Sequence, residues 1–167
     1  MDNIILIGFM GSGKSSVGRY MHRKGYAFID TDSYIEKKEK RKIKEIFATD
    51  GEAYFRSCET RALEEIIAEG KDDFVIAVGG GLVMTPANQP LLHKLGKVVY
   101  LRATVDTLLS RLKDDSNRPL LQGGTMREKI ETLMEQREAT YKKVADLVVD
   151  TDNRSFEHIY RIIKKHI

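Results

Sequence analysis

Short apolar runs alternate with longer amphipathic stretches along the whole chain. Five runs have the length and composition of buried strands, and seven stretches place apolar residues at helical spacing. The predicted strands are Ile4–Ile7, Ala27–Ile29, Phe74–Val78, Val98–Leu101 and Leu147–Val149, and the predicted helices are Ser15–Arg23, Ser33–Glu39, Glu52–Glu69, Ala87–Leu95, Val105–Leu112, Met126–Val144 and Phe156–His166. Strands that alternate with helices predict an α/β fold in which a parallel sheet is covered on both faces.

Composition limits the classes of protein that this chain can belong to. With 167 residues, of which 41% are hydrophobic, we expect residues 1–167 to form one domain. The net charge is only +3 and basic residues are interleaved with acidic ones, so we expect no nucleic acid partner. No run approaches the roughly 20 apolar residues of a membrane-spanning helix. The single cysteine, Cys58, excludes an intrachain disulfide, and we expect a cytoplasmic protein.

The first apolar run passes directly into GFMGSGKS at residues 8–15, which fits the pattern G-x-x-x-x-G-K-[ST]. Glycines here let successive backbone N–H groups point at an anion. Lys14 then supplies a positive charge to the β- and γ-phosphates, and Ser15 supplies a hydroxyl for Mg²⁺. The alternative is a chance match in a glycine-rich turn, but the strand before it and the helix after it favour a phosphate-binding loop.

Candidate ligand-binding segments also follow the second and third predicted strands, where ligands of such folds bind. Asp30-Thr31-Asp32 follows the second strand, and its acids could hold water on Mg²⁺ or accept a substrate hydroxyl. The alternative for such an acid is a helix N-cap. Gly79-Gly80-Gly81 follows the third strand, where a bare backbone allows a ligand to approach closely. The alternative there is a flexible connection.

Two arginines are candidates for binding an anion. Arg137 falls on the apolar stripe of its predicted helix, in line with Ile130 and Tyr141. The alternatives for it are a structural ion pair or an arginine that extends to the surface. Arg56 has Glu59 one turn later, which could pair with it on the surface or orient it towards a ligand.

The polar segment 113–124 joins two predicted helices and contains Arg118. Loops of this size in a phosphate-loop domain can close over the nucleotide and deliver an arginine to the transferring group. A plain solvated connection is the alternative.

The chain carries the motifs GFMGSGKSSVG, FIDTD, IFATDGEAYFR, VGGG, NRPLL and the pair Arg137 and Tyr141. In the order and spacing of these motifs and in total length, it resembles the shikimate kinase family. The resemblance implies a single three-layer P-loop kinase domain of the nucleoside-monophosphate-kinase type. Its five-stranded parallel sheet would have the order 2-3-1-4-5, with helices on both faces and a lid at about 113–124. The implied activity is ATP-dependent phosphorylation of the 3-hydroxyl of shikimate by a monomer, on the route to chorismate.

The resemblance also implies a role for each matching residue. Asp32 would hold the shikimate hydroxyls and accept the proton of the attacking one, while Arg56 and Arg137 would clamp the carboxylate. Lys14, Asp32 and Arg118 would form the catalytic set, and Ser15 and Asp30 would hold Mg²⁺. The implied ATP contacts are Gly11, Ser12, Gly13, Lys14, Ser15, Ser16, Arg111, Arg118 and Asn153, and the implied shikimate contacts are Asp32, Arg56, Gly79, Gly80, Gly81 and Arg137.

One departure from the family pattern and two rival functions remain. Ala77 stands where many relatives carry a hydroxyl residue near the metal-bound water, so the outer shell of the Mg²⁺ site is in question. A related kinase acting on gluconate or a nucleoside monophosphate is one rival, although two arginines with Asp32 favour an acidic polyol. A nucleotide-dependent switch is the other rival, but the chain has no NKxD motif.

Overall fold

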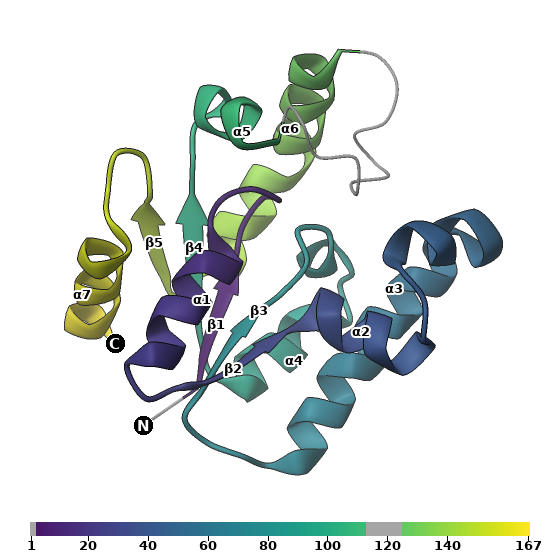
Figure 1. The fold of residues 1–167 in the computed structure, drawn as a ribbon, viewed down its shortest axis with the longest axis horizontal. Helices are drawn as coiled ribbons and strands as arrows, with labels where there is room; N and C mark the ends of the chain where they lie inside the picture. Colours follow the sequence, from purple (N-terminus) through teal and green to yellow (C-terminus); the bar gives the residue numbers. More distant parts are fainter. Residues whose placement is uncertain (1–2, 113–124) are drawn as a thin grey trace.

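The computed structural model describes residues 3–112 and 125–167, and a parallel sheet of five strands runs through them (Figure 1). The strands are β1 (Ile4–Ile7), β2 (Ala27–Asp30), β3 (Phe74–Ala77), β4 (Lys97–Arg102) and β5 (Leu147–Asp150). Their spatial order is β2-β3-β1-β4-β5, and every pair is parallel. The predicted fold class and the implied strand order are therefore confirmed.

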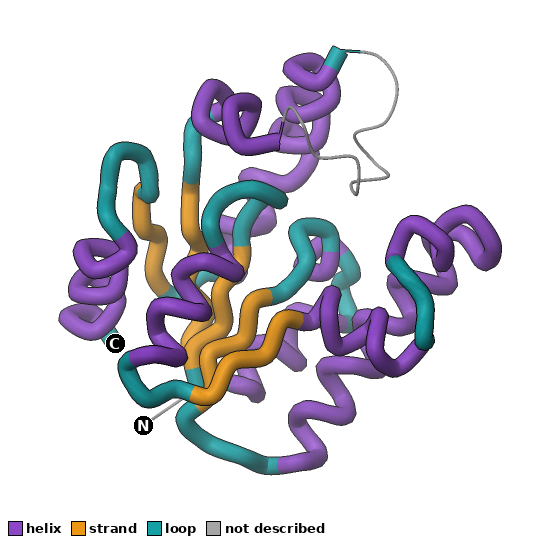
Figure 2. The backbone as a smooth tube through the Cα atoms, in the orientation of Figure 1, coloured by secondary structure: helices purple, strands orange, loops and turns teal. Residues whose placement is uncertain are grey.

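Helices cover both faces of the sheet (Figure 2). Alternate residues of the strands pack against the helices on one face or the other. On one face, Ile5 and Tyr100 pack against α3 (Ile43–Glu69), α4 (Asn88–Leu95) and α6 (Met126–Val144). On the other face, Leu6 and Val99 pack against α1 (Lys14–Arg23) and α7 (Phe156–His166). This two-sided burial explains why the strands are nearly continuous apolar runs.

Three further elements complete the described part of the chain. Helix α5 (Val105–Leu112) packs with the start of α6, and α2 (Thr31–Glu39) packs on α3. A short 3₁₀ helix, η1 (Leu82–Met84), follows the three glycines and was not predicted. Among residues 3–112 and 125–167, every helix is too short or too polar to span a membrane.

Helix α3 begins nine residues earlier than the sequence predicted, at Ile43 instead of Glu52. Its backbone leaves helical geometry at Gly51, where φ is 85° and ψ is 173°. The apolar spacing of this first part is confined to Ile43, Ile46 and Phe47 directly after a run of mixed charges, and the prediction, which took no account of it, was wrong for this part. Ile46 is nevertheless fully buried, because it packs against Ile35 of α2.

The strand register brings three loops to one edge of the sheet. Leu6 of β1 and Asp30 of β2 both lie opposite Ala77 of β3. The segments that follow these strands therefore start side by side. They are the phosphate loop at 8–13, the acidic turn at 30–32 and the three glycines at 79–81.

Candidate active site

The phosphate loop wraps its backbone around the start of α1. Gly11 and Gly13 have φ of 83° and 102°, which a residue with a Cβ rarely adopts, and Gly13 is the N-cap of α1. Lys14 is the first residue of this helix, and its Nζ donates to the carbonyl oxygens of Gly8 and Phe9 at 2.9 Å each. The loop is thus held closed around the lysine, and the helix N-terminus adds a positive partial charge.

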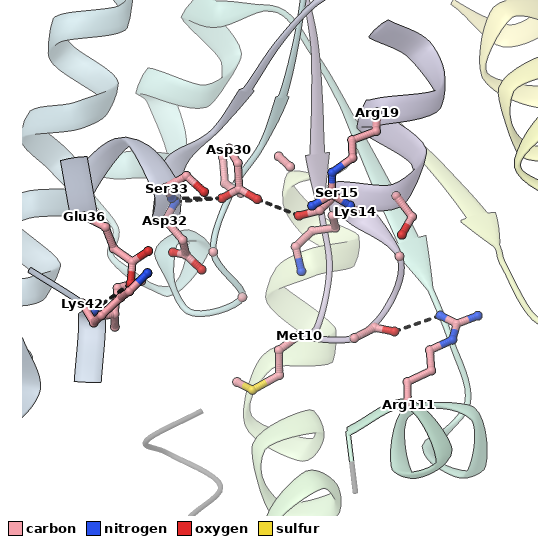
Figure 3. A pocket seen from close by; sticks show the side chains of 18 of the residues that line it. Met10, Lys14, Ser15, Arg19, Asp30, Asp32, Ser33, Glu36, Lys42 and Arg111 are labelled. Atoms are coloured by element: carbon pink, nitrogen blue, oxygen red, sulfur yellow. Dashed lines mark hydrogen bonds between the residues drawn. The ribbon is translucent and has the colours of Figure 1, made fainter. Parts of the chain in front are cut away.

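A cleft of about 640 Å³ opens between this loop, the acidic turn and the glycines. Figure 3 shows Lys14 and Ser15 on one side of it and α2 residues Asp32 and Glu36 on the other. Ser12 Oγ is buried and has no hydrogen-bond partner among the described residues. An unsatisfied hydroxyl costs free energy unless a ligand binds it, so the loop is suited to an anion with several oxygens. Gly11, Gly13, Lys14, Ser15, Ser16, Asp30, Asp32, Gly79, Gly80 and Arg111 are among the lining residues.

Asp30 has two roles, one of which was the alternative left open by the sequence. Its Oδ1 caps α2 by accepting from the N–H groups of Asp32 at 3.0 Å and Ser33 at 3.3 Å. Its Oδ2 accepts from Ser15 Oγ at 2.6 Å. One hydroxyl and one carboxylate side by side are hard oxygen ligands of the kind that Mg²⁺ uses together with phosphates and water. The residues present therefore fit a Mg²⁺ ion that a nucleotide helps to hold.

The three glycines are packed against charged side chains and do not form a loose connection. A Cβ on Gly79 would lie 2.9 Å from Asp32 Oδ1 and 3.1 Å from Glu59 Oε2. The Gly79 N–H donates to Thr31 Oγ1 at 3.1 Å, which ties this segment to the acidic turn. None of the three has a positive φ, so a side chain here would act by displacing these charged groups and not by straining the backbone.

Arg137 is buried beside the second glycine. Only 4% of the residue is exposed, which excludes an arginine that extends to solvent. Its Nη1 would lie 3.2 Å from a Cβ on Gly80 and has no hydrogen-bond partner among the described residues. Its guanidinium carbon is 5.7 Å from the centre of the Phe9 ring. A buried guanidinium with an unsatisfied nitrogen next to a ligand cleft is a site for an anion.

Tyr141, one turn after Arg137 on α6, donates its hydroxyl hydrogen to the Gly80 carbonyl. Burial raises the pKa of this tyrosine to about 12, so it remains a donor at neutral pH. Its ring packs against Tyr100, with the ring centres 5.1 Å apart. The glycine segment is therefore attached to the helix that carries Arg137.

Arg56 lies against the third glycine and is bound by two carboxylates. Its Nη1 donates to Glu59 Oε1 at 2.8 Å, and its Nη2 donates to Glu52 Oε2 at 3.1 Å. Glu59 is fully buried, so the predicted alternative of a surface pair is wrong, and its orientation of Arg56 towards a ligand stays a prediction. Burial raises the pKa of Glu59 to about 7, against the opposing attraction of Arg56. A Cβ on Gly81 would lie 2.5 Å from Arg56 Nη2.

The predicted residues are not all in one place. Arg56, Gly81 and Arg137 are not among the residues that line the cleft; they lie next to its glycine wall. Arg111 Nη1 donates to the Gly11 carbonyl at 2.8 Å, so it is already at the phosphate loop. Asn153 is exposed on the loop before α7, and its nucleotide contact stays a prediction. Arg118 and the predicted lid at 113–124 lie outside the described residues.

Sequence reasoning assigned no role to three residues of this site. Thr31 holds the glycine segment, Tyr141 anchors Gly80, and Glu52 binds Arg56. The position of Thr31 between two acids and the tyrosine one turn after Arg137 were available signals in the sequence. Neither identifies its partner, because each partner lies more than 45 residues away along the chain.

The phosphate loop follows β1, the central strand of a sheet with the order 2-3-1-4-5, and the acidic turn and the three glycines lie at the same sheet edge. This combination defines a P-loop kinase of the nucleoside-monophosphate-kinase type. The model of the family described as shikimate kinase matches residues 10–167, and the chain belongs to the shikimate kinase family.

Individual relatives agree with this membership. The shikimate kinase of Pelotomaculum thermopropionicum is 42% identical over 171 residues, covering 99% of this chain and 98% of that protein. The shikimate kinase of Geobacter metallireducens is 44% identical, covering 94% and 87%. Among solved structures, shikimate kinase from Acinetobacter baumannii in complex with shikimate matches with a TM-score of 0.93 at 36% identity, covering 99% of this chain and 92% of that one.

Proposed function

We propose that this chain transfers the γ-phosphoryl group of ATP to the 3-hydroxyl of shikimate, giving shikimate 3-phosphate and ADP. The observation that carries the acceptor assignment is the buried Arg137 Nη1, which has no partner among the described residues and lies beside Gly80 at the edge of the phosphate cleft. A carboxylate bound there would satisfy this nitrogen and neutralise its charge. Family membership supports the same acceptor, since the relatives are shikimate kinases.

On the acceptor side, each residue has a separate task. Arg56 and Arg137 bind the carboxylate, and together they fix the orientation of the ring. Asp32 lines the cleft and would accept a hydrogen bond, and then the proton, from the attacking hydroxyl. The backbone of Gly79, Gly80 and Gly81 borders the ring, because these positions have no side chain to exclude it.

On the nucleotide side, the backbone of residues 11–16 binds the phosphates, and Lys14 compensates the charge that develops on the transferring group. Ser15 and Asp30 would hold Mg²⁺, which would neutralise part of the negative charge of the phosphates. Ala77 lies opposite Asp30 in the sheet and supplies no side-chain hydrogen bond to this site. Arg111, Asn153 and the lid residue Arg118 complete the proposed nucleotide contacts.

A coupled assay of ADP release across a panel of acceptors tests this proposal. We expect rapid release with shikimate, slower release with quinate, and only background release with gluconate or nucleoside monophosphates. Release that does not depend on any acceptor would indicate a nucleotide switch, and release with gluconate or a nucleoside monophosphate would indicate a related kinase. We further propose that residues 1–167 act as one domain and as a monomer in the cytoplasm. Sedimentation of the purified chain would test whether it is a monomer.

A further inference from the structure

The guanidinium of Arg56 is bound on two sides by acids of its own helix. Glu59 Oε1 accepts from Nη1 at 2.8 Å. Glu52 Oε2 accepts from Nε at 3.3 Å and from Nη2 at 3.1 Å. Two carboxylates therefore surround a side chain that the proposed function requires to bind a third carboxylate, that of the acceptor.

A planar guanidinium offers two edges at which a carboxylate can bind with two hydrogen bonds. Glu52 occupies the edge formed by Nε and Nη2. The other edge, formed by Nη1 and Nη2, lies against Gly81, where a Cβ would be only 2.7 Å from Nη1 and 2.5 Å from Nη2. Nη1 on this edge also donates its hydrogen bond to Glu59. The edge that Glu52 occupies is thus the one available to an incoming carboxylate.

The two acids differ in how firmly they are held. The Glu59 side chain is 1% exposed and cannot leave without exposing buried surface. The Glu52 side chain is 52% exposed. It also follows Gly51 directly, where the backbone of α3 leaves helical geometry. Glu52 can therefore turn into solvent, while Glu59 keeps Arg56 in place.

We propose that Glu52 occupies the position on Arg56 that the acceptor carboxylate takes, and that the acceptor displaces it on binding. This inference rests on the proposed function, since it assumes that Arg56 binds the acceptor. It makes Glu52 a specificity-determining residue. An acceptor without a carboxylate leaves Glu52 in place and meets an arginine whose charge is already neutralised.

The size of the effect follows from the exposure of the pair. An exposed ion pair between residues four apart on a helix is weak, because water solvates both partners once they separate. Displacement of Glu52 therefore costs little, and removing its charge should strengthen acceptor binding by about twofold to fivefold. The direction of the change in Kd distinguishes the two roles that Glu52 could have. If Glu52 helped to position Arg56, removing its charge would weaken acceptor binding.

The test is calorimetric titration of shikimate into the wild-type chain and into Glu52→Gln, with Glu52→Ala as a second variant. We expect the Kd for shikimate to fall in both variants and the Kd for nucleotide to stay unchanged. A shikimate analogue whose carboxylate is reduced to an alcohol should bind wild type and Glu52→Gln equally, because it does not compete for Arg56. A Kd for shikimate that rises or stays the same in both variants would overturn the inference.

Two control variants on the same helix distinguish a specific effect of Glu52 from a general effect of removing a negative charge. Glu64→Gln makes the same change in charge at an exposed position, and it should leave every Kd unchanged. Glu59→Gln should raise the Kd for shikimate, because it removes the acid that holds Arg56. If wild type binds no shikimate at all, the proposed function fails. If wild type binds it and Glu52→Gln does not bind it more tightly, only the present inference fails.

Discussion

Replacing Arg137 with lysine should weaken acceptor binding strongly and leave nucleotide binding almost unchanged. The arginine is 4% exposed, and its Nη1 has no hydrogen-bond partner among the described residues. Lysine keeps the positive charge but cannot present two parallel donors to a carboxylate. The perturbation therefore removes the geometry of the contact and leaves its charge.

The expected magnitude is that of one lost charge-assisted hydrogen bond in a buried site. Such a bond contributes about 1.5–3 kcal/mol, which corresponds to a rise in KM for shikimate of roughly tenfold to a hundredfold. Arg127→Lys is the matched control, because Arg127 lies on the same helix but is exposed and paired with Asp106. We expect that control to change no kinetic constant.

The assay measures initial rates at saturating ATP with shikimate, and then with the analogue whose carboxylate is reduced to an alcohol. Wild type should discriminate sharply between the two acceptors, and Arg137→Ala should discriminate far less. Equal discrimination by wild type and Arg137→Ala would refute the reasoning. It would mean that Arg137 has a structural role and that another residue recognises the acid.

Three further predictions concern neighbouring parts of the site. Lys14→Ala should remove about 3–4 kcal/mol of transition-state stabilisation and so lower kcat strongly, while thermal unfolding shows an intact fold. Near-normal turnover in this variant would contradict the role of Lys14. Tyr141→Phe removes the donor to Gly80 and should raise KM for shikimate by about threefold to tenfold, whereas Tyr100→Phe, in the same ring pair, should leave KM unchanged. Glu59 has a pKa of about 7 in the folded chain and 4.5 as its ordinary value, so the folded state holds this proton more tightly. The free energy of unfolding should therefore fall by up to about 3 kcal/mol as pH rises from about 4.5 to 7. Urea unfolding of Glu59→Gln should lack this part of the pH dependence. Identical pH profiles for wild type and Glu59→Gln would show that the pKa of Glu59 is not raised.

Features that depend on local pattern were predicted from the sequence. Apolar runs and glycine spacing specify the strands and the phosphate loop, because the periodicity of a buried strand and the conformation of a tight loop are local properties. Arg137 was found because a cation on an apolar stripe needs an anionic partner. The 27-residue helix α3 was only partly predicted, because the apolar pattern before Gly51 is short and Gly51 interrupts it.

Pairings between distant segments were not predicted. The contact of Thr31 with Gly79 joins residues 48 apart, and that of Tyr141 with Gly80 joins residues 61 apart. The sequence around Thr31 or Tyr141 does not indicate the partner residue, because strand order and register bring the distant segments together. The pairing of Arg56 with Glu52 is local, at four residues, but which edge of the guanidinium remains open depends on Gly81.

The most direct test of the central claim is the identity of the product. The purified chain is incubated with ATP, Mg²⁺ and shikimate, and the product is analysed by phosphorus–proton correlation NMR. The account predicts a phosphoryl group coupled to the proton on carbon 3 of the shikimate ring, formed in equal amount with ADP. Inorganic phosphate as the sole product, or a phosphoryl group on a different hydroxyl, would contradict it.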